Sequence, residues 1–396
     1  MLRRYDGVAL GGHPVIPLAV PNLVGREAEY LQECVGSTFV SSIGPFVERF
    51  EQAVAHEAGT VGAVAVASGT AGLHLALRAI GVDEGDLVAL PAFTFVASAN
   101  AISYCGAAPW LFDISEDSWT LDPDQLAETL KDRLAPGPDG PVERSSGRRL
   151  AAVMPVHTLG HPADMDPIVD AAAAYDVPVV ADAAAALGAR YRGRSVGAVG
   201  AAVSVFSFNG NKTITAGGGG AVASDDGAVL DRARHLSTTA RRGPAYDHDE
   251  VGFNYRLTNV QAAVGCAQME QLERFISAKR FIAAFYRQAF CSLPAVQDFP
   301  LAEWADSACW FSGLVLQDMT PGEVHEARAR LRSLGVDARP FWKPMHLQRP
   351  YAAVMREPQP VTERIWEHVL PLPCSTGITP AELEHVASAV HQALQS

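Results

Sequence analysis

Between about residues 60 and 270, short apolar runs alternate with segments of helical spacing, and this alternation most limits what the chain can fold into. The apolar runs are Gly62–Ala67, Leu87–Pro91, Leu150–Val156, Val177–Ala181 and Ala202–Phe208. Short strands that alternate with helices are typical of parallel sheets, because each crossover helix packs on a face of the sheet. We therefore expect an α/β fold with a mainly parallel sheet and helices on both faces.

The rest of the chain indicates a second, smaller unit. A long helical pattern from Asn259 to Phe290 leads away from the expected sheet. An apolar strand at Phe311–Leu316, a helix at Pro321–Leu334 and a last helix at Pro380–Leu394 follow it. We expect a large α/β domain over residues 1–275, including an N-terminal segment, and a small α+β domain over residues 276–396.

Composition restricts the partners and the compartment. At 48% hydrophobic residues the chain can bury a large core, which excludes disorder. The 31 Lys and Arg minus 44 Asp and Glu give a charge of −13, which argues against nucleic acid or an anionic membrane as the main partner. The sequence has no run of about 18 apolar residues and no signal-peptide pattern. Six scattered cysteines favour a reducing compartment, so we expect a cytoplasmic protein without a metal site.

The stretch Ser68-Gly69-Thr70 lies where a strand ends and a helix with apolar spacing begins. A serine or threonine at this place can cap the free N–H groups of the helix. The same N–H groups, together with the hydroxyls and the helix dipole, can bind a phosphate. From the residues alone, a helix cap and an anion site both remain open.

Two further residues carry charge at the expected carboxyl edge of the sheet. Asp182 ends the run Val177–Ala181, where α/β folds place ligands, although it could instead cap the next helix. Lys212 follows the run Ala202–Phe208 and precedes four glycines, Gly217–Gly220. A desolvated lysine of lowered pKa suits imine chemistry, and the glycines allow a flat ligand to approach the backbone.

The ordered set of Ser-Gly-Thr, Asp, Lys and the glycine-rich stretch resembles the DegT/DnrJ/EryC1/StrS family of sugar aminotransferases. The resemblance covers nearly the whole chain, from Ile16-Pro17 to Leu370–Cys374. It implies the aspartate-aminotransferase fold, which is the type I fold of pyridoxal 5′-phosphate (PLP) enzymes. Ser237–Ala240 and Arg339–Gln348 resemble the subgroup that aminates C4 of UDP-linked 4-keto-6-deoxy-N-acetylhexosamines, in bacillosamine-type and legionaminic-acid-type pathways.

The resemblance also implies a role for each matching residue. Lys212 would hold PLP covalently and move protons, while Asp182 would pair with the pyridinium nitrogen of the ring. Phe95 would stack on the ring face. The residues implied to hold the phosphate are Gly69, Thr70 and Ser207.

The same resemblance implies partners. Asn254, with Arg256, would reach the phosphate region of the cofactor in a neighbouring subunit, which implies a homodimer with shared active sites. The implied substrates are a nucleotide sugar and glutamate as the amino donor. His346 is implied to contact the sugar, although it could instead satisfy a loop carbonyl. His157 is as compatible with packing as with a substrate contact.

One position departs from the family pattern. Three residues after Asp182 the family has Gln, Glu or His near the cofactor, whereas Ala185 stands here in an alanine run. A methyl group cannot make that hydrogen bond, so a water or another side chain would have to replace it.

Three other functions are compatible with parts of the sequence. A sugar dehydratase of the same family has histidine in place of the lysine, so Lys212 argues against it. A PLP-binding regulatory protein without turnover has only Ala185 in its favour. An aminotransferase for a cyclitol ketone or another keto sugar remains the alternative to one for a UDP-linked sugar.

Overall fold

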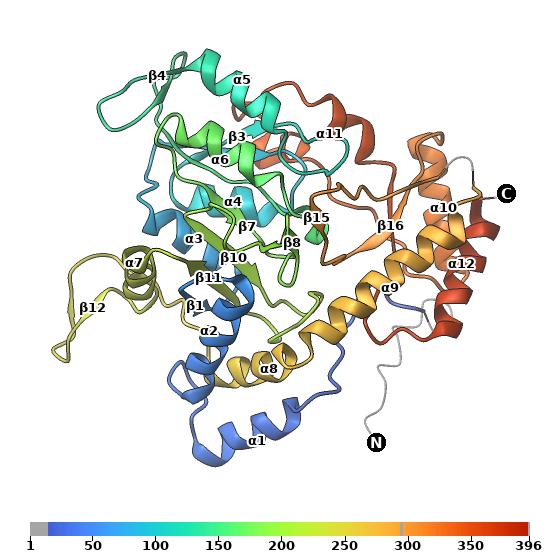
Figure 1. The fold of residues 1–396 in the computed structure, drawn as a ribbon, viewed down its shortest axis with the longest axis horizontal. Coiled ribbons are helices and arrows are strands. Elements are labelled where there is room, and N and C mark those ends of the chain that lie inside the picture. The colour runs from blue at the N-terminus through green and yellow to red at the C-terminus, as the bar shows by residue number, and fades with distance from the viewer. Residues whose placement is uncertain (1–14, 294–295, 395–396) are drawn as a thin grey trace.

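The computed structural model describes residues 15–293 and 296–394 (Figure 1). Its α-helices are α1 (Glu27–Ser37), α2 (Pro45–Ala58), α3 (Gly69–Ala79), α4 (Val96–Tyr104), α5 (Pro123–Arg133), α6 (Met165–Ala173), α7 (Gly227–Ser237), α8 (Asn259–Met269), α9 (Leu272–Phe290), α10 (Pro321–Ser333), α11 (Pro360–Ile365) and α12 (Pro380–Leu394). The short 3₁₀ helices are η1 (Thr158–Gly160), η2 (Met345–Leu347) and η3 (Arg349–Tyr351).

The strands fall into a central group and several short ones. The central strands are β1 (Gly62–Val66), β2 (Leu87–Pro91), β3 (Ala108–Phe112), β6 (Leu150–Val153), β7 (Val180–Asp182), β10 (Val203–Ser207) and β11 (Gly220–Ser224). The others are β4 (Leu134–Ala135), β5 (Val142–Glu143), β8 (Arg190–Tyr191), β9 (Arg194–Ser195), β12 (Arg241–Arg242), β13 (Asp247–His248), β14 (Gln297–Asp298), β15 (Ala305–Asp306), β16 (Ser312–Val315) and β17 (Val369–Leu372).

The central strands form one mainly parallel sheet, as the alternating pattern predicts. A four-stranded part has the order β1-β11-β10-β7, and a three-stranded part has the order β3-β2-β6. Parallel bridges from Val153 to Val179 and from Val156 to Asp182 join the two parts. Within this sheet β11 alone runs antiparallel to its neighbours, so β1 and β10 on either side of it point the same way.

Helices cover both faces of the sheet because each strand alternates its side chains between two cores. In β1, Ala63 and Ala65 pack with α2 and α8, whereas Val64 and Val66 pack with α3. Small residues on one face and branched residues on the other are what a strand buried on both sides requires. Figure 1 shows the blue α2 and the green strands above the yellow α8. The predicted α/β fold class is confirmed.

The C-terminal part of the chain forms a smaller layer at one end of the molecule. Its sheet has the order β14-β16-β17, and α9, α10 and α12 pack near it (Figure 1). The helical pattern predicted from Asn259 to Phe290 is in fact two helices, α8 and α9, separated at Glu270–Gln271. The start of α9 packs in the core of the large unit and its end in the core of the small unit.

This change of core along α9 supports a boundary near residue 275, which stays a prediction. The N-terminal segment contacts the small unit instead of the sheet: Ile16 bridges to Val336, and the backbone N–H of Cys374 donates to the carbonyl of Leu18 at 2.8 Å. Among the described residues, no helix has the length and apolar character that crossing a bilayer requires.

Candidate active site

Three of the predicted site segments meet at the carboxyl edge of the sheet. Asp182 is the last residue of β7 and Ser207 the last residue of β10. Val66, at the end of β1, and Ser207 both lie opposite Gly220 of β11, so the stretch after β1 comes close to the end of β10. Lys212 follows β10 by five positions. Strand order therefore brings together residues that are far apart in the sequence.

The start of α3 and the end of β10 approach each other closely enough to require glycine. A Cβ at Gly69 would lie 2.8 Å from the Cβ of Ser207 and 3.1 Å from its Oγ. Ser68 caps α3 through its Oγ, which accepts from the N–H of Ala71 at 3.1 Å. This cap leaves other N–H groups of the first turn, near Ser207 and the half-buried Thr70, for an anion. The geometry fits a phosphate cradle, and the cap and the anion site are compatible.

Gly69→Ala is expected to weaken PLP binding about tenfold, because the added methyl group must push Ser207 out of the cradle. Titration of the apoprotein with PLP measures this. Gly36→Ala is the matched control, since a Cβ there meets nothing within 4 Å. Equal affinity of the Gly69 variant and the wild type would remove the cradle assignment.

Asp182 is a buried carboxylate that accepts two hydrogen bonds. It is 5% exposed, its Oδ2 accepts from Ser98 Oγ at 2.6 Å, and its Oδ1 accepts from the N–H of Ala184 at 3.1 Å. Burial raises the pKa of Asp182, while these two hydrogen bonds and the charge of Lys212 lower it. A buried carboxylate is costly unless a positive group neutralises it, so the site suits the protonated nitrogen of a pyridine ring. Ser98 lies in the first turn of α4, and no sequence pattern pointed to it.

Lys212 lies in the turn after β10, where its backbone N–H donates to the carbonyl of Asn209 at 3.0 Å. Burial lowers the pKa of the Lys212 amine to about 8, and the charge of Asp182 partly opposes this change. The Nζ lies 3.8 Å from the centre of the Trp310 ring. A larger fraction of neutral amine near neutral pH is what attack on an aldehyde requires. Together with the cradle and Asp182, this lysine fits PLP.

Phe95 immediately precedes α4, the helix that carries Ser98. Its side chain is 56% exposed, in contrast to the fully buried Phe93 two residues earlier. Its ring centre lies 6.2 Å from that of Trp342. An exposed aromatic ring beside the site has a free face, so stacking on the cofactor ring stays a prediction that this geometry supports.

Ala185 packs its methyl group against the core of the small unit. Its carbonyl lies near Gly160, where a Cβ would come within 2.9 Å of the oxygen. The side chain donates no hydrogen bond, as expected from the sequence. The side chain that bonds to Asp182 is the Ser98 hydroxyl, and the alanine run contributes only the backbone N–H of Ala184.

The two histidines differ in their surroundings. His157 is buried, and its Nδ1 accepts from the N–H of Ala163 at 3.0 Å. Burial lowers its pKa to about 4, which favours the packing alternative. His346 lies in η2, beside the end of β2, because the N–H of Met345 donates to the carbonyl of Ala92. It is buried and lies 3.3 Å from Glu363, and neither ring nitrogen makes a hydrogen bond within the described chain.

Asn254 and Arg256 point in different directions. Asn254 is exposed, and its side chain makes no hydrogen bond within the described part of the chain. Arg256 lies against its own subunit, with its Nη1 3.2 Å from Glu51 Oε1 and most of its side chain buried. The Asn254 side chain is therefore available to contact a neighbouring subunit, whereas Arg256 forms an ion pair with Glu51 of its own chain.

One group among the described residues has metal-ligating side chains close together: His235, Asp249 and Glu250, between α7 and the segment after β13. Arg232 pairs with Glu250, and Arg242 pairs with Asp249. These arginines already neutralise both carboxylates, so the cluster is an ion-pair network.

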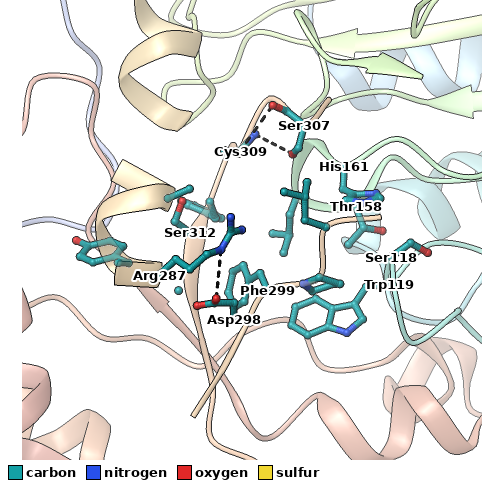
Figure 2. Close-up of a pocket in the computed structure, with 17 residues that line it drawn as sticks. Ser118, Trp119, Thr158, His161, Arg287, Asp298, Phe299, Ser307, Cys309 and Ser312 are labelled. Carbon is teal, nitrogen blue, oxygen red and sulfur yellow. Dashed lines mark hydrogen bonds and ion pairs between the residues drawn. The ribbon is translucent and has the colours of Figure 1, made fainter. Parts of the chain in front are cut away.

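A cavity of about 60 Å³ lies away from Lys212, between the loops after β3 and β6, the helix α9 and the strands of the small unit (Figure 2). Figure 2 shows Arg287 turned towards Asp298, with which it forms an ion pair of 3.2 Å. Neither Lys212 nor Asp182 lines this cavity. It is too small for a nucleotide sugar, so it is separate from the predicted site.

Comparison with known proteins identifies the family of the chain. The profile of the DegT/DnrJ/EryC1/StrS aminotransferase family matches residues 21–391. EpsN of Bacillus subtilis (strain 168) is 40% identical over 339 residues, which are 85% of this chain and 84% of EpsN. GDP-perosamine synthase of Caulobacter vibrioides is 36% identical over 388 residues, 96% of this chain and 99% of that protein. The crystal structure of DesI with its TDP-sugar product is 30% identical and has a TM-score of 0.83, covering 96% of this chain and 94% of DesI.

A family match over most of the chain and a shared fold lead to one assignment, with which the desolvated Lys212 amine and the buried Asp182 are compatible. The chain belongs to the DegT/DnrJ/EryC1/StrS family and is a PLP-dependent aminotransferase with the type I fold.

Proposed function

We propose that the protein transfers the amino group of glutamate to the C4 ketone of a nucleotide-linked 4-keto-6-deoxy sugar. The observation that carries this proposal is the desolvated amine of Lys212, which lies near a buried carboxylate at the carboxyl edge of the sheet. The relatives support the sugar class, since GDP-perosamine synthase and the product-bound DesI are named for nucleotide sugars.

Each residue of the proposed site has a separate role in this reaction. When bound, PLP supplies a ring that accepts electrons from the reacting carbon and carries the amino group between substrates. Asp182 keeps a proton on the ring nitrogen, because its buried charge is neutralised there. Lys212 anchors the cofactor and moves a proton at the reacting carbon with its Nζ. Gly69, Thr70 and Ser207 hold the phosphate.

The nucleotide is the finer part of the proposal. The stretches Ser237–Ala240 and Arg339–Gln348 favour a UDP-linked N-acetylated sugar. The second stretch carries His346 and lies beside the end of β2, near Phe95, because Met345 bonds to Ala92. We propose His346 as a substrate contact for this reason, with GDP- and TDP-linked sugars and a cyclitol ketone as the competing substrates.

Turnover with a panel of these ketones and glutamate labelled in its nitrogen tests the proposal. Mass spectrometry is expected to show labelled nitrogen in the UDP-linked sugar most rapidly. Faster labelling of a GDP- or TDP-linked sugar would change the nucleotide, and labelling of the cyclitol alone would change the substrate class. No labelling of any ketone by PLP-loaded protein would favour a binding protein without turnover.

We also propose a homodimer in which Asn254 completes the phosphate site of the partner's cofactor. Asn254 follows the hairpin of β12 and β13, which projects away from the body of the subunit (Figure 1). Its exposed amide makes no hydrogen bond to the described residues of its own chain, as expected of a residue that a second copy uses. Because Arg256 pairs with Glu51, the proposal rests on Asn254 alone.

Mixing Lys212→Ala chains with Asn254→Ala chains is expected to restore activity that neither variant has alone. In a heterodimer of a two-fold assembly, one site carries both defects and the other carries neither. The chains must be dissociated and reassembled, and the Asn254 variant must have low activity by itself. If native mass spectrometry detects heterodimers and activity does not return, Asn254 serves its own subunit.

A further inference from the structure

Trp310 is the side chain that lies directly against the amine of Lys212. Its ring centre is 3.8 Å from Nζ, a distance typical of a strong cation–π contact. Trp310 is only 4% exposed, so little water competes with the ring for the ammonium. The two residues are distant in the chain and belong to different units of the fold.

Three hydrogen bonds from three elements hold Trp310 in place. Its indole Nε1–H donates to the carbonyl of Asn211 at 2.7 Å, next to Lys212. Its backbone N–H donates to the carbonyl of Leu159 at 2.9 Å. Its own carbonyl accepts from Lys279 Nζ at 2.9 Å. The Trp310 ring is therefore held against Lys212 by contacts with η1 of the large unit, with the loop that carries Lys212, and with α9.

The bond from Lys279 is an unusual one for a protein interior. Lys279 is 2% exposed, and its Nζ donates also to the carbonyl of Cys374 at 2.6 Å. Among the described residues, no carboxylate forms an ion pair with it. Burying an ammonium without an ion-pair partner costs more free energy than burying an apolar side chain. What Lys279 contributes in return is two hydrogen bonds that fix the backbone of Trp310 and Cys374.

A lysine that carries a cofactor needs a place for its amine after the substrate has displaced it from the cofactor. While it is attached it is neutral or shares its proton with the cofactor, but when the substrate amine replaces it, Nζ becomes a free amine that binds a proton. It must then stay near the reacting carbon without returning to solvent. The face of an indole attracts an ammonium and has little attraction for a neutral amine.

We propose that Trp310 is a positioning residue that holds the Lys212 ammonium on its indole face whenever the lysine is free of the cofactor. This proposal rests on the assignment of Lys212 in the proposed function. The charged group that acts on Lys212 is Asp182, and Trp310 lies against the Lys212 amine. Since the indole stabilises only the protonated amine, it raises the pKa of Lys212 above the value that burial and Asp182 alone would set.

The test is the pH dependence of covalent PLP attachment to the apoprotein, which requires the neutral amine. Burial and Asp182 together set the pKa of the Lys212 amine to about 8, so the wild type, with the indole added, is expected to reach half its maximal rate above pH 8. Trp310→Leu, which has no aromatic face, is expected to lower this midpoint by about 0.5 to 1.5 pH units, and Trp310→Phe by a smaller amount. Trp110→Phe is the matched control, because Trp110 is also buried and its indole donates to Glu357 at 2.8 Å.

The outcomes separate the hypotheses. The proposal is supported if the pH midpoint of PLP attachment is lowest in Trp310→Leu, intermediate in Trp310→Phe and highest in the wild type, provided that Trp110→Phe keeps the wild-type midpoint. An unchanged or raised midpoint in both folded Trp310 variants overturns it, and a loss of thermal stability without a shift shows a structural role only. If Lys212→Ala still attaches PLP covalently, the lysine assignment fails instead.

Discussion

Lys212→Ala is expected to lose transamination by a factor of about 10⁴ or more while the protein keeps its fold. The reaction needs an amine that can hold the cofactor and move a proton, and alanine offers neither. Lys212 lies in a turn and not in a helix or strand, so truncation should leave the sheet and its cores intact. Steady-state turnover and thermal unfolding measure the two effects.

Lys131→Ala is the control, because Lys131 is an exposed residue of α5 far from the carboxyl edge of the sheet. Its activity should equal that of the wild type. Wild-type turnover in Lys212→Ala would show that another group carries the cofactor.

Asp182→Asn is expected to lose activity by several orders of magnitude and still bind PLP. An amide is isosteric but carries no charge, so it cannot keep the ring nitrogen protonated. The phosphate cradle at Gly69 and Ser207 and the lysine remain, and these contacts retain the cofactor. Activity above about a tenth of the wild type, a loss under about 1.4 kcal/mol, would contradict pairing with the nitrogen.

The same variant has a second, independent readout. The charge of Asp182 raises the pKa of Lys212 against the effect of burial, so its removal should lower that pKa below the value of about 8. The midpoint of PLP attachment to the apoprotein should then move to lower pH. Asp86→Asn is the matched control: Asp86 is also buried and lies 2.6 Å from Arg149, but it precedes β2 at the opposite edge of the sheet.

Local sequence patterns were sufficient to predict a mainly parallel central sheet and the main candidate residues of the site. Ser68–Thr70, Asp182 and Lys212 each follow an apolar strand, and parallel strands bring their carboxyl ends to one edge. Their proximity could therefore be predicted without any knowledge of side-chain packing. The same local signals predicted α10 and α12 to within one residue, because apolar spacing and N-terminal prolines mark these helices.

The pattern from Asn259 to Phe290 shows what local spacing leaves undetermined. Both halves have helical periodicity, so the sequence indicated one helix. The break at Glu270–Gln271 arises because α8 packs against α1 and α2, whereas α9 turns towards the small unit. Where one segment of helical periodicity packs in two different cores, the packing determines the direction of each helix axis.

Local patterns in the sequence were enough to predict the α/β fold, the order of the site segments, and Lys212 and Asp182 as site candidates. The tertiary structure alone decided which side chains surround them: Ser98 on Asp182, Trp310 on Lys212, and Glu51 on Arg256. Strand direction and periodicity are properties of neighbouring residues, whereas these three contacts join residues 84, 98 and 205 positions apart. Such pairs form only when whole elements pack, and no pattern within a single element encodes them.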